Sequence, residues 1–402
     1  MRSRGRTRAT WLTRGVAGGL GVLLLGLAAS PASAESVRSD EWHLDAMHAD
    51  EMWQSSKGQG VTVAVIDTGV NPTLGDLEGQ VLRGKDFSGK PGDERTDYDR
   101  HGTSIASLIA GTGKGKGAFG LAPEAKILPV RVSDFKGSEN AADAYAKFSK
   151  SLSAGIRYAA DSEAKVINIS LAAEEVTPDL GEAVKYARDK GKLIFAGVGN
   201  TGDKGNPVMY PAATPGVVGV GAVDKNLRIT AESERGPQVD LVAPGDEIVQ
   251  ACDGGTEICT GHGTSASTAL ASASAALVWA KHPDWTANQV TRVLLNTAGG
   301  PANGPKRNDS IGYGMVRPRI VLKNPGDPGP ADVDPLAGPG AKTPVPSQSA
   351  AAGAKAPEQV AADAPSGDGD GNTALWLGVG GGAVVVVAAV VAAVMVGRRR
   401  RA

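Results

Sequence analysis

The sequence predicts an α/β fold: a doubly wound, mostly parallel sheet with helices on both faces. Five short runs are nearly continuous in apolar, often β-branched residues, which is typical of strands buried on both faces. These runs are 61–66, 125–132, 165–171, 192–198 and 216–223. Helical patterns separate them, and this alternation is typical of right-handed βαβ crossovers.

The helical segments support the same fold. Helices are expected over 102–110, 140–160 and 178–190, and a long run of Ala and Ser over 266–280 indicates another. Thr286 and Gln289 have the spacing of a capping box, and Trp285 and Val290 can form the hydrophobic staple beside it. A helix should therefore run from there to about residue 297.

Composition excludes several classes of function. The chain has 402 residues, 42 Lys+Arg against 43 Asp+Glu, and a formal net charge of −1. This balance excludes a polybasic nucleic-acid binder. The glycine- and lysine-rich stretch 111–117 follows a helical pattern and lacks the Gly-Lys-Ser/Thr of a phosphate-binding loop, so we interpret it as a flexible surface loop. No dense metal-ligand set is visible, and no cofactor is expected.

The N-terminal region predicts secretion. Residues 1–34 combine five arginines, an apolar stretch and the small-residue sequence Ala32-Ser33-Ala34, as in a cleavable signal peptide. The next stretch, 35–60, is shorter than the ~40 residues that an independently folding pro-domain needs. We interpret it as a strap that packs on the folded domain, 61–322, and we expect activity without release of a pro-domain.

The C-terminal region predicts a membrane anchor. Residues 323–373 are rich in Pro, Ala and Gly and lack aromatic residues, as in a disordered linker. Residues 374–396 carry no charge and can span a bilayer core of ~30 Å as a helix. Four arginines lie in the tail, 397–402, and by the positive-inside rule this tail stays in the cytoplasm. The folded domain is then extracytoplasmic and tethered by one helix.

Two cysteines and three histidines are assigned no catalytic role. Cys252 and Cys259 are seven residues apart, and in an extracytoplasmic domain they most simply form a small-loop disulfide. The contexts of three histidines indicate helical or turn surface: His43, His48 and His282.

Polar residues follow two of the predicted strands. Asp67 directly follows the first strand, and Asn200 follows the strand at 192–198. Ligands of open α/β sheets bind beyond the carboxyl ends of strands, so both side chains are placed for function. The alternatives are a turn-forming Asp before glycine and an Asn in a left-handed turn.

The tetrapeptide His-Gly-Thr-Ser occurs twice, at His101 and at His262. Ser265 closes the second copy at the start of the Ala/Ser helix, where the helix N-terminus favours a developing oxyanion. Ser104 and His262 are rival candidates for nucleophile and base. We prefer His101 as the base, because the ring of His262 should point away from the hydroxyl three residues further on.

These motifs resemble the subtilisin-like serine proteases. Asp67-Thr-Gly, His101-Gly-Thr, Gly199-Asn200 and Gly263-Thr-Ser265 occur in that family's order and with its flanking residues. The resemblance covers about 42–320 and implies a subtilisin-like fold with an Asp-His-Ser triad. It implies that Ser265 attacks the scissile carbonyl and that His101, oriented by Asp67, moves the proton.

The resemblance extends to the rest of the site. Asn200 would help to form the oxyanion hole, and the strand with Ser170 and Leu171 would bind the substrate as an added strand. At three positions the chain lacks the residue that the family often has, and these departures put its substrate range and catalytic rate in doubt. The positions are Ala172, Ala266 and Ala269.

Within the family the chain looks most like the mycosins, the membrane-anchored proteases associated with type VII secretion. The signal peptide, strap, linker, membrane span and basic tail carry this resemblance. It implies protein substrates and partners among type VII secretion membrane components. Two alternatives stay open: a structural subunit that stabilises a secretion assembly, and a broad degradative surface protease.

Overall fold

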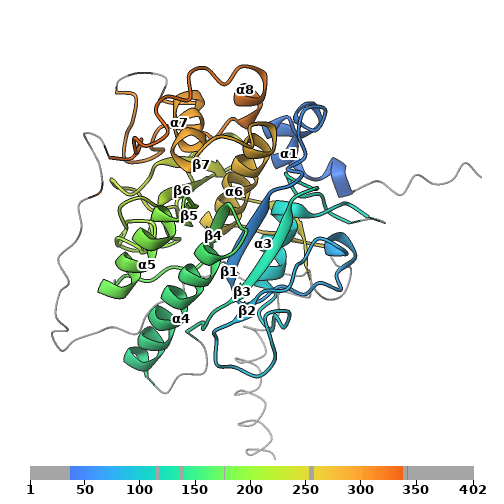
Figure 1. The fold of residues 1–402 in the computed structure, drawn as a ribbon. Helices are drawn as coiled ribbons and strands as arrows, with labels where there is room; N and C mark the ends of the chain where they lie inside the picture. Colours follow the sequence, from blue (N-terminus) through green and yellow to red (C-terminus); the bar gives the residue numbers. More distant parts are fainter. Residues whose placement is uncertain are drawn as a thin grey trace, which may run out of the picture. The chain divides into compact units, whose positions relative to one another are not determined.

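The computed structural model describes residues 37–337 and 342, apart from 115–116, 136–139, 176, 253–257, 302 and 304. Seven parallel strands form the central sheet of this described part, in the order β2-β3-β1-β4-β5-β6-β7 (Figure 1). Their bounds are Thr62–Asp67 (β1), Lys85–Asp86 (β2), Lys126–Arg131 (β3), Val166–Ile169 (β4), Leu193–Gly197 (β5), Val218–Val223 (β6) and Leu241–Pro244 (β7).

The predicted fold class is confirmed, with differences at the strand ends. All five predicted runs contain a strand, and the chain crosses from β1 to β3 and then back to β4 on the other side of β1. This reversal makes the sheet doubly wound. The strand predicted over 165–171 ends at Ile169, so Ser170 and Leu171 lie just beyond β4 and not in it. The sequence analysis missed the short edge strand β2 and the strand β7.

Alternate residues of each strand face opposite sides of the sheet. Val63 and Val65 of β1 belong to one buried cluster, and Ala64 and Ile66 belong to the other. The helices α3 (His101–Ala110) and α6 (Thr264–Lys281) cover the first face, and α4 (Ala141–Asp161) and α5 (Pro178–Asp189) cover the second. Burial on both faces explains why these strands are apolar throughout.

The helix ends follow the capping signals in the sequence. The Asn140 side chain accepts from the Asp143 amide at 2.9 Å to begin α4. The predicted capping box begins α7 (Ala287–Thr297), with the Thr286 amide donating to the Gln289 side chain at 3.1 Å. Such caps satisfy amides that the first helical turn leaves without partners.

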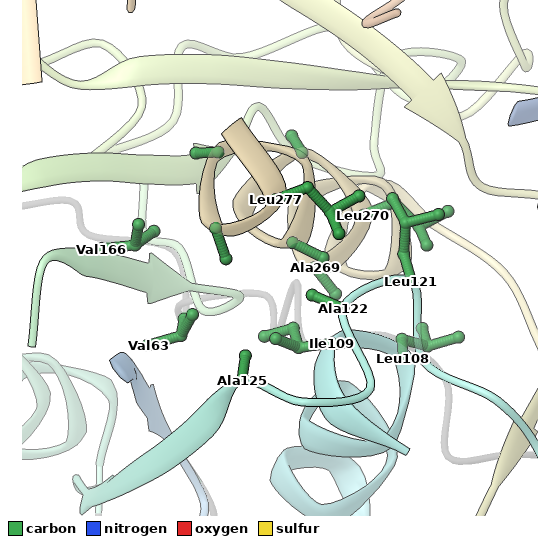
Figure 2. Close-up of a cluster of buried hydrophobic side chains, with 14 of the residues drawn as sticks. Val63, Leu108, Ile109, Leu121, Ala122, Ala125, Val166, Ala269, Leu270 and Leu277 are labelled. Carbon is green, nitrogen blue, oxygen red and sulfur yellow. The ribbon is translucent and has the colours of Figure 1, made fainter. Parts of the chain in front are cut away.

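The helices α3 and α6 pack closely because their facing side chains are small or aliphatic. Figure 2 shows Ala269, Leu270 and Leu277 of α6 in one cluster with Leu108 and Ile109 of α3. Ala269 is completely buried in this contact. α6 continues without interruption to Lys281, and its alanines let a neighbouring helix approach closely.

The segment before β1 packs on the domain. It forms the helices η1 (Val37–Ser39), α1 (Trp42–Met47) and α2 (Ala49–Met52), and its buried apolar side chains join the cluster under α3 and α6. The Trp53 indole donates to the Leu121 carbonyl at 2.9 Å. The interpretation of His43 as a surface residue is wrong: it is fully buried, and burial lowers the pKa of His43 to about 3.

The folded domain extends past residue 322, where the sequence analysis placed the start of a disordered linker. The helix α8 (Pro318–Lys323) is followed by 324–337, which lies against α7. Arg292 donates to the Pro328 carbonyl at 2.6 Å, and Gln289 donates to the Gly329 carbonyl at 3.0 Å. The segment has little core of its own, but α7 side chains bond its carbonyl groups, which composition does not reveal.

A disulfide joins Cys252 to Cys259 beside the antiparallel pair β8 (Ile248–Ala251) and β9 (Ile258–Gly261). In the described part of the chain, no helix has both the length and the apolar character needed to cross a bilayer. The predicted signal peptide, the membrane span 374–396 and most of the linker lie outside the described residues.

In the glycine-rich stretch 111–117, Gly111 is buried and Lys114 is exposed, and hydrogen bonds hold the two residues that follow the stretch. The Phe119 amide donates to the Glu41 carboxyl group at 2.6 Å, and the Ala118 amide donates to Asp76 at 3.0 Å. Glu41 is fully buried, and burial raises its pKa from 4.5 to about 8. The strap thus contributes a carboxyl group that is protonated at neutral pH.

We expect Glu41→Gln to flatten the pH dependence of stability. Between pH 4.5 and 8 the folded state keeps the Glu41 proton and the unfolded state does not, so the free energy of unfolding falls as pH rises. In this range the free energy of unfolding of the wild type should fall by roughly 1 kcal/mol per pH unit more than that of the variant. Urea unfolding at pH 5, 6.5 and 8 measures it, with exposed Glu78→Gln as control. Parallel pH dependences for wild type and Glu41→Gln would contradict the assignment.

Candidate active site

Three neighbouring strands bring polar residues to one edge of the sheet. Asp67 ends β1, Ser170 follows β4, and Asn200 lies just after β5. Ile66 and Ile169 are paired in the β1–β4 ladder, so Asp67 and Ser170 each stand one residue past a matched pair. Neighbouring strands are about 4.8 Å apart. This edge is the topological switch point, where α/β sheets bind their ligands.

Asp67 and His101 are in direct contact. Their Oδ1 and Nδ1 atoms are 2.7 Å apart, and both side chains are almost completely buried. The Thr68 amide also donates to Oδ1 at 2.7 Å. A Cβ on Gly102 would lie 2.1 Å from the Gly69 carbonyl oxygen, so only glycine lets α3 begin this close to the Asp67 loop.

A second carboxylate holds the beginning of α3. Asp97 Oδ2 accepts from the Thr103 amide at 2.8 Å and from the Thr103 hydroxyl at 2.6 Å. Its Oδ1 accepts from the Thr68 hydroxyl at 2.7 Å. Asp97 therefore connects the first turn of α3 to the loop after β1, and it fixes the position of His101 relative to Asp67.

The surroundings favour a basic imidazole at His101. Burial alone lowers the pKa of His101, but the charge and hydrogen bond of Asp67, with the charges of Asp97 and Asp99, outweigh it and raise the pKa above its usual 6.5. The Nδ1 atom is engaged by Asp67. Nε2 is buried and has no hydrogen-bond partner among the described residues, so it is the ring nitrogen left for proton transfer.

Ser265 lies in the first turn of α6 and faces the residue after β4. Its hydroxyl donates to the Ser170 carbonyl at 3.1 Å, and the Ser170 hydroxyl donates to the Ser265 carbonyl at 3.2 Å. This reciprocal pair attaches the beginning of α6 to the sheet edge. Within the described part of the chain, no hydrogen bond joins Ser265 to His101.

Asn200 is attached to the same helix end. Its Oδ1 atom accepts from the Thr264 amide at 2.8 Å and from the Thr264 hydroxyl at 2.9 Å. Because Oδ1 is occupied, the amide nitrogen is the group available to donate to a ligand. A Cβ on Gly263 would lie 2.8 Å from this nitrogen, and Gly263 has a φ of 108°, so glycine is needed here for two reasons.

The rival residues are engaged elsewhere. The Ser104 hydroxyl donates to the Arg100 carbonyl at 3.0 Å within its own helix and is buried. His262 Nδ1 lies 3.0 Å from a carboxylate oxygen of Glu232. Of the two tetrapeptides, the first supplies the histidine that contacts Asp67, and the second supplies the serine in the first turn of α6.

The predicted substrate-binding residues are held near Ser265. Ser170 and Leu171 are each only 3% exposed. Ala173 beyond them pairs with Tyr210 in an antiparallel bridge. Among the described residues, no group of three or more His, Cys, Asp or Glu side chains could hold a metal ion.

Sequence reasoning missed four supporting residues. Thr264 lies inside the Gly-Thr-Ser motif, and Thr68 follows Asp67 directly, so motif position could have identified both. Asp97 and Glu234 come from loops that carry no periodic signal. Glu234 stands in the polar run Glu232-Ser-Glu234, which has the composition of an exposed turn, yet its side chain is fully buried.

The comparisons with known proteins agree with this fold and site. The model of the Subtilase family matches residues 58–314. The chain therefore belongs to the subtilase family, the subtilisin-like serine proteases. A thermophilic serine proteinase of Bacillus sp. (strain AK1) is 38% identical over 234 residues, which is 56% of this chain and 56% of that protein. The aligned region thus covers less than two thirds of this relative's own length.

Among solved structures the chain is similar to mycosins. The MycP3 protease from the type VII (ESX-3) secretion system is 34% identical with a TM-score of 0.61, and the match covers 70% of this chain and 87% of that one. A chain of the periplasmic assembly from the ESX-5 inner membrane complex is 30% identical with a TM-score of 0.62, over 77% of this chain and 90% of that one.

Proposed function

We propose that this chain hydrolyses peptide bonds of secreted proteins, with Ser265 as nucleophile, His101 as general base and Asp67 as the group that orients the imidazole. The observation that carries the proposal is the 2.7 Å contact between Asp67 Oδ1 and His101 Nδ1. It leaves Nε2, buried and without a described partner, to receive a proton. The negative charge of Asp67 stabilises the imidazolium that forms.

In this mechanism the Ser265 hydroxyl turns from the Ser170 carbonyl to His101 Nε2 when substrate binds. Catalytic hydrogen bonds often align only in the complex with substrate. Ser265 Oγ then bonds to the scissile carbonyl carbon, and its proton passes to Nε2. The oxyanion is stabilised by the Ser265 amide at the N-terminus of α6 and by the Asn200 amide nitrogen.

Collapse of this intermediate breaks the peptide bond. The proton on His101 passes to the leaving amine, and an acyl group remains on Ser265. Water then attacks the acyl carbon and gives a proton to His101. The bond between Ser265 Oγ and the acyl carbon breaks, the proton on His101 passes to Oγ, and the carboxyl product leaves. Substrate backbone is bound by the segment at Ser170 and Leu171, next to the Ser265 contact.

We also propose that the domain is secreted and anchored by one helix. The uncharged residues 374–396 and the four arginines after them support a single span with the tail in the cytoplasm. The likeness to the MycP3 protease and to a chain of the ESX-5 assembly supports a place in a type VII secretion system.

A second function, support of a secretion assembly, is favoured by one observation. The match to a chain of the periplasmic ESX-5 assembly covers 77% of this chain and 90% of that one. We propose that the domain also stabilises such an assembly by its presence, so the proteolytic and structural roles can be separated by inactivating Ser265 alone.

Ser265→Ala should lower turnover of a casein probe by several orders of magnitude, as removal of the triad serine does in subtilisin itself. The protein is the full chain purified in detergent, and its melting curve serves as the folding control. Unchanged cleavage would exclude Ser265 as the nucleophile.

In the host strain, normal export with Ser265→Ala alone would favour the supporting role, and blocked export would favour proteolysis. Extensive casein digestion by the wild type would favour a broad degradative protease.

The two histidines of the repeated tetrapeptide should respond differently. His101→Gln removes the base and should lower kcat at least a thousandfold, an order estimated from triad variants. His262→Gln breaks the pair with Glu232 and should change kcat by less than about fivefold, because that ring is turned to a carboxylate and not to the nucleophile. Reversed effects would assign the base to His262.

Asn200→Ala should lower kcat by about 10² to 10³ with little change in KM, the range given for the oxyanion asparagine of subtilisin. The reason is that the amide nitrogen meets charge only in the transition state. Steady-state kinetics on a chromogenic peptide measures the effect. A loss of less than about twofold would remove Asn200 from this role.

A further inference from the structure

We propose that Glu234 is a positioning residue whose carboxyl group holds the loop that carries Asn200. This inference rests on the proposed proteolytic function and deepens it. Glu234 lies outside the three motifs that contain Asp67, His101 and Ser265. It is nevertheless fully buried directly against the oxyanion loop, which is defined here as Gly199 to Thr201.

Glu234 forms hydrogen bonds with both residues that flank Asn200. Its backbone amide donates to the Gly199 carbonyl at 3.3 Å. Its Oε1 atom accepts from the Thr201 hydroxyl at 2.7 Å. One residue therefore fixes the loop immediately before and immediately after the oxyanion amide.

The loop also sits directly on the carboxyl group. Gly199 has a φ of 114°, and a Cβ at this position would lie 2.4 Å from Glu234 Oε1. The Asn200 side chain is held separately, by the Thr264 amide and hydroxyl. Asn200 is thus held by two residues. Thr264 orients its side-chain amide, and Glu234 fixes the position of its backbone.

The carboxyl group is neutral at pH 7. Burial raises the pKa of Glu234 from 4.5 to about 8, and this outweighs the hydrogen bonds with Thr201, which lower it. The charge of Glu174 raises it further. Glu234 Oε2 has no hydrogen-bond partner in the part of the chain that the structure describes.

Other charged groups near this loop are turned elsewhere. Glu174 is exposed on the segment after β4. Glu232, two residues before Glu234, is paired with His262. Asp203 and Lys204, further along the loop from Asn200, are exposed. Above pH 8 the ionised Glu234 would therefore stay unpaired beneath the loop.

This charge has a predictable effect on catalysis. The oxyanion loop stabilises negative charge in the transition state, and a buried carboxylate next to it opposes that charge and displaces the loop. The kcat of the wild type should therefore fall as pH rises through about 8. Gln cannot ionise and keeps an oxygen for the Thr201 hydroxyl, so Glu234→Gln should keep its kcat.

The test compares Glu234→Gln with Glu41→Gln in the purified full chain. Both carboxyl groups have a pKa raised to about 8 by burial, but Glu41 lies in the strap and contacts the Phe119 amide. Between pH 7 and 9.5 the wild type and Glu41→Gln should lose casein turnover about tenfold, and Glu234→Gln should lose less than about twofold. An alkaline loss in Glu234→Gln equal to that of the wild type overturns the inference.

A second measurement distinguishes positioning from a general effect on folding. Glu234→Ala should lower kcat about tenfold with KM unchanged, because displacement of a reacting group by a fraction of an ångström costs this much. In an Asn200→Ala background the same change should cost less than about twofold, since the group that it positions is gone. Fully multiplicative effects contradict the positioning role.

Failure of the proposed function has a separate signature. Diisopropyl fluorophosphate forms a Ser265 Oγ–P bond as the P–F bond breaks, fluoride leaves and the serine proton passes to His101. Wild-type protein that is not labelled, or labelled as well after Ser265→Ala, would exclude the proposed nucleophile. If Ser265 is labelled but Glu234→Gln loses turnover at alkaline pH as the wild type does, Ser265 is kept as the proposed nucleophile and the role of Glu234 is rejected.

Discussion

The site depends on the packing of α3 against α6 on one face of the sheet. Each of these helices carries a candidate catalytic residue in its first turn, His101 in α3 and Ser265 in α6. All ten residues of α3 are buried, and so is every residue of α6 up to Trp279. Because the contact surfaces are built from alanine and aliphatic side chains (Figure 2), the two helix axes can lie close enough to share one edge of the sheet.

Buried hydrogen bonds then fix what packing brings together. Asp97 links the loop after β1 to the start of α3, the reciprocal Ser170–Ser265 bonds link β4 to α6, and Asn200 accepts two bonds from Thr264. Each network joins a strand end to a helix N-terminus, where backbone amides lack partners. The hydrogen bonds that hold this edge are therefore already formed without substrate.

The sequence was sufficient for the fold class, and it predicted a candidate site at the ends of the strands. Runs such as 192–198 are apolar at every position because both sheet faces are covered, and the Thr286 capping box is local in sequence, so both could be interpreted without coordinates. These features depend on neighbours in the chain or on one periodic pattern.

Features that depend on distant contacts could not be predicted. β2 is two residues long and has no periodicity, and β7 is stabilised by its ladder with β6. His43 has the sequence context of a helix-surface residue, but it is fully buried where the strap packs on the domain. The segment 324–337 reads as disordered because the side chains that bond it belong to α7. Glu234 shows the same limit: only the fold reveals that a loop glutamate is buried beneath Gly199.

The helix α2, near the start of the domain, meets α8, near its end. Glu51 of α2 lies 3.8 Å from Arg319 of α8 and also pairs with Lys323. Beyond α8, the segment 324–337 is attached to α7 through side chain–carbonyl bonds, and its Asp334 pairs with Arg188 of α5. Further along, Lys342 pairs with the buried Asp240. The chain is thus attached to the domain at several points after α8, so a pull on the chain beyond residue 342 would load the Lys342–Asp240 pair before it reached Asp67, His101 or Ser265.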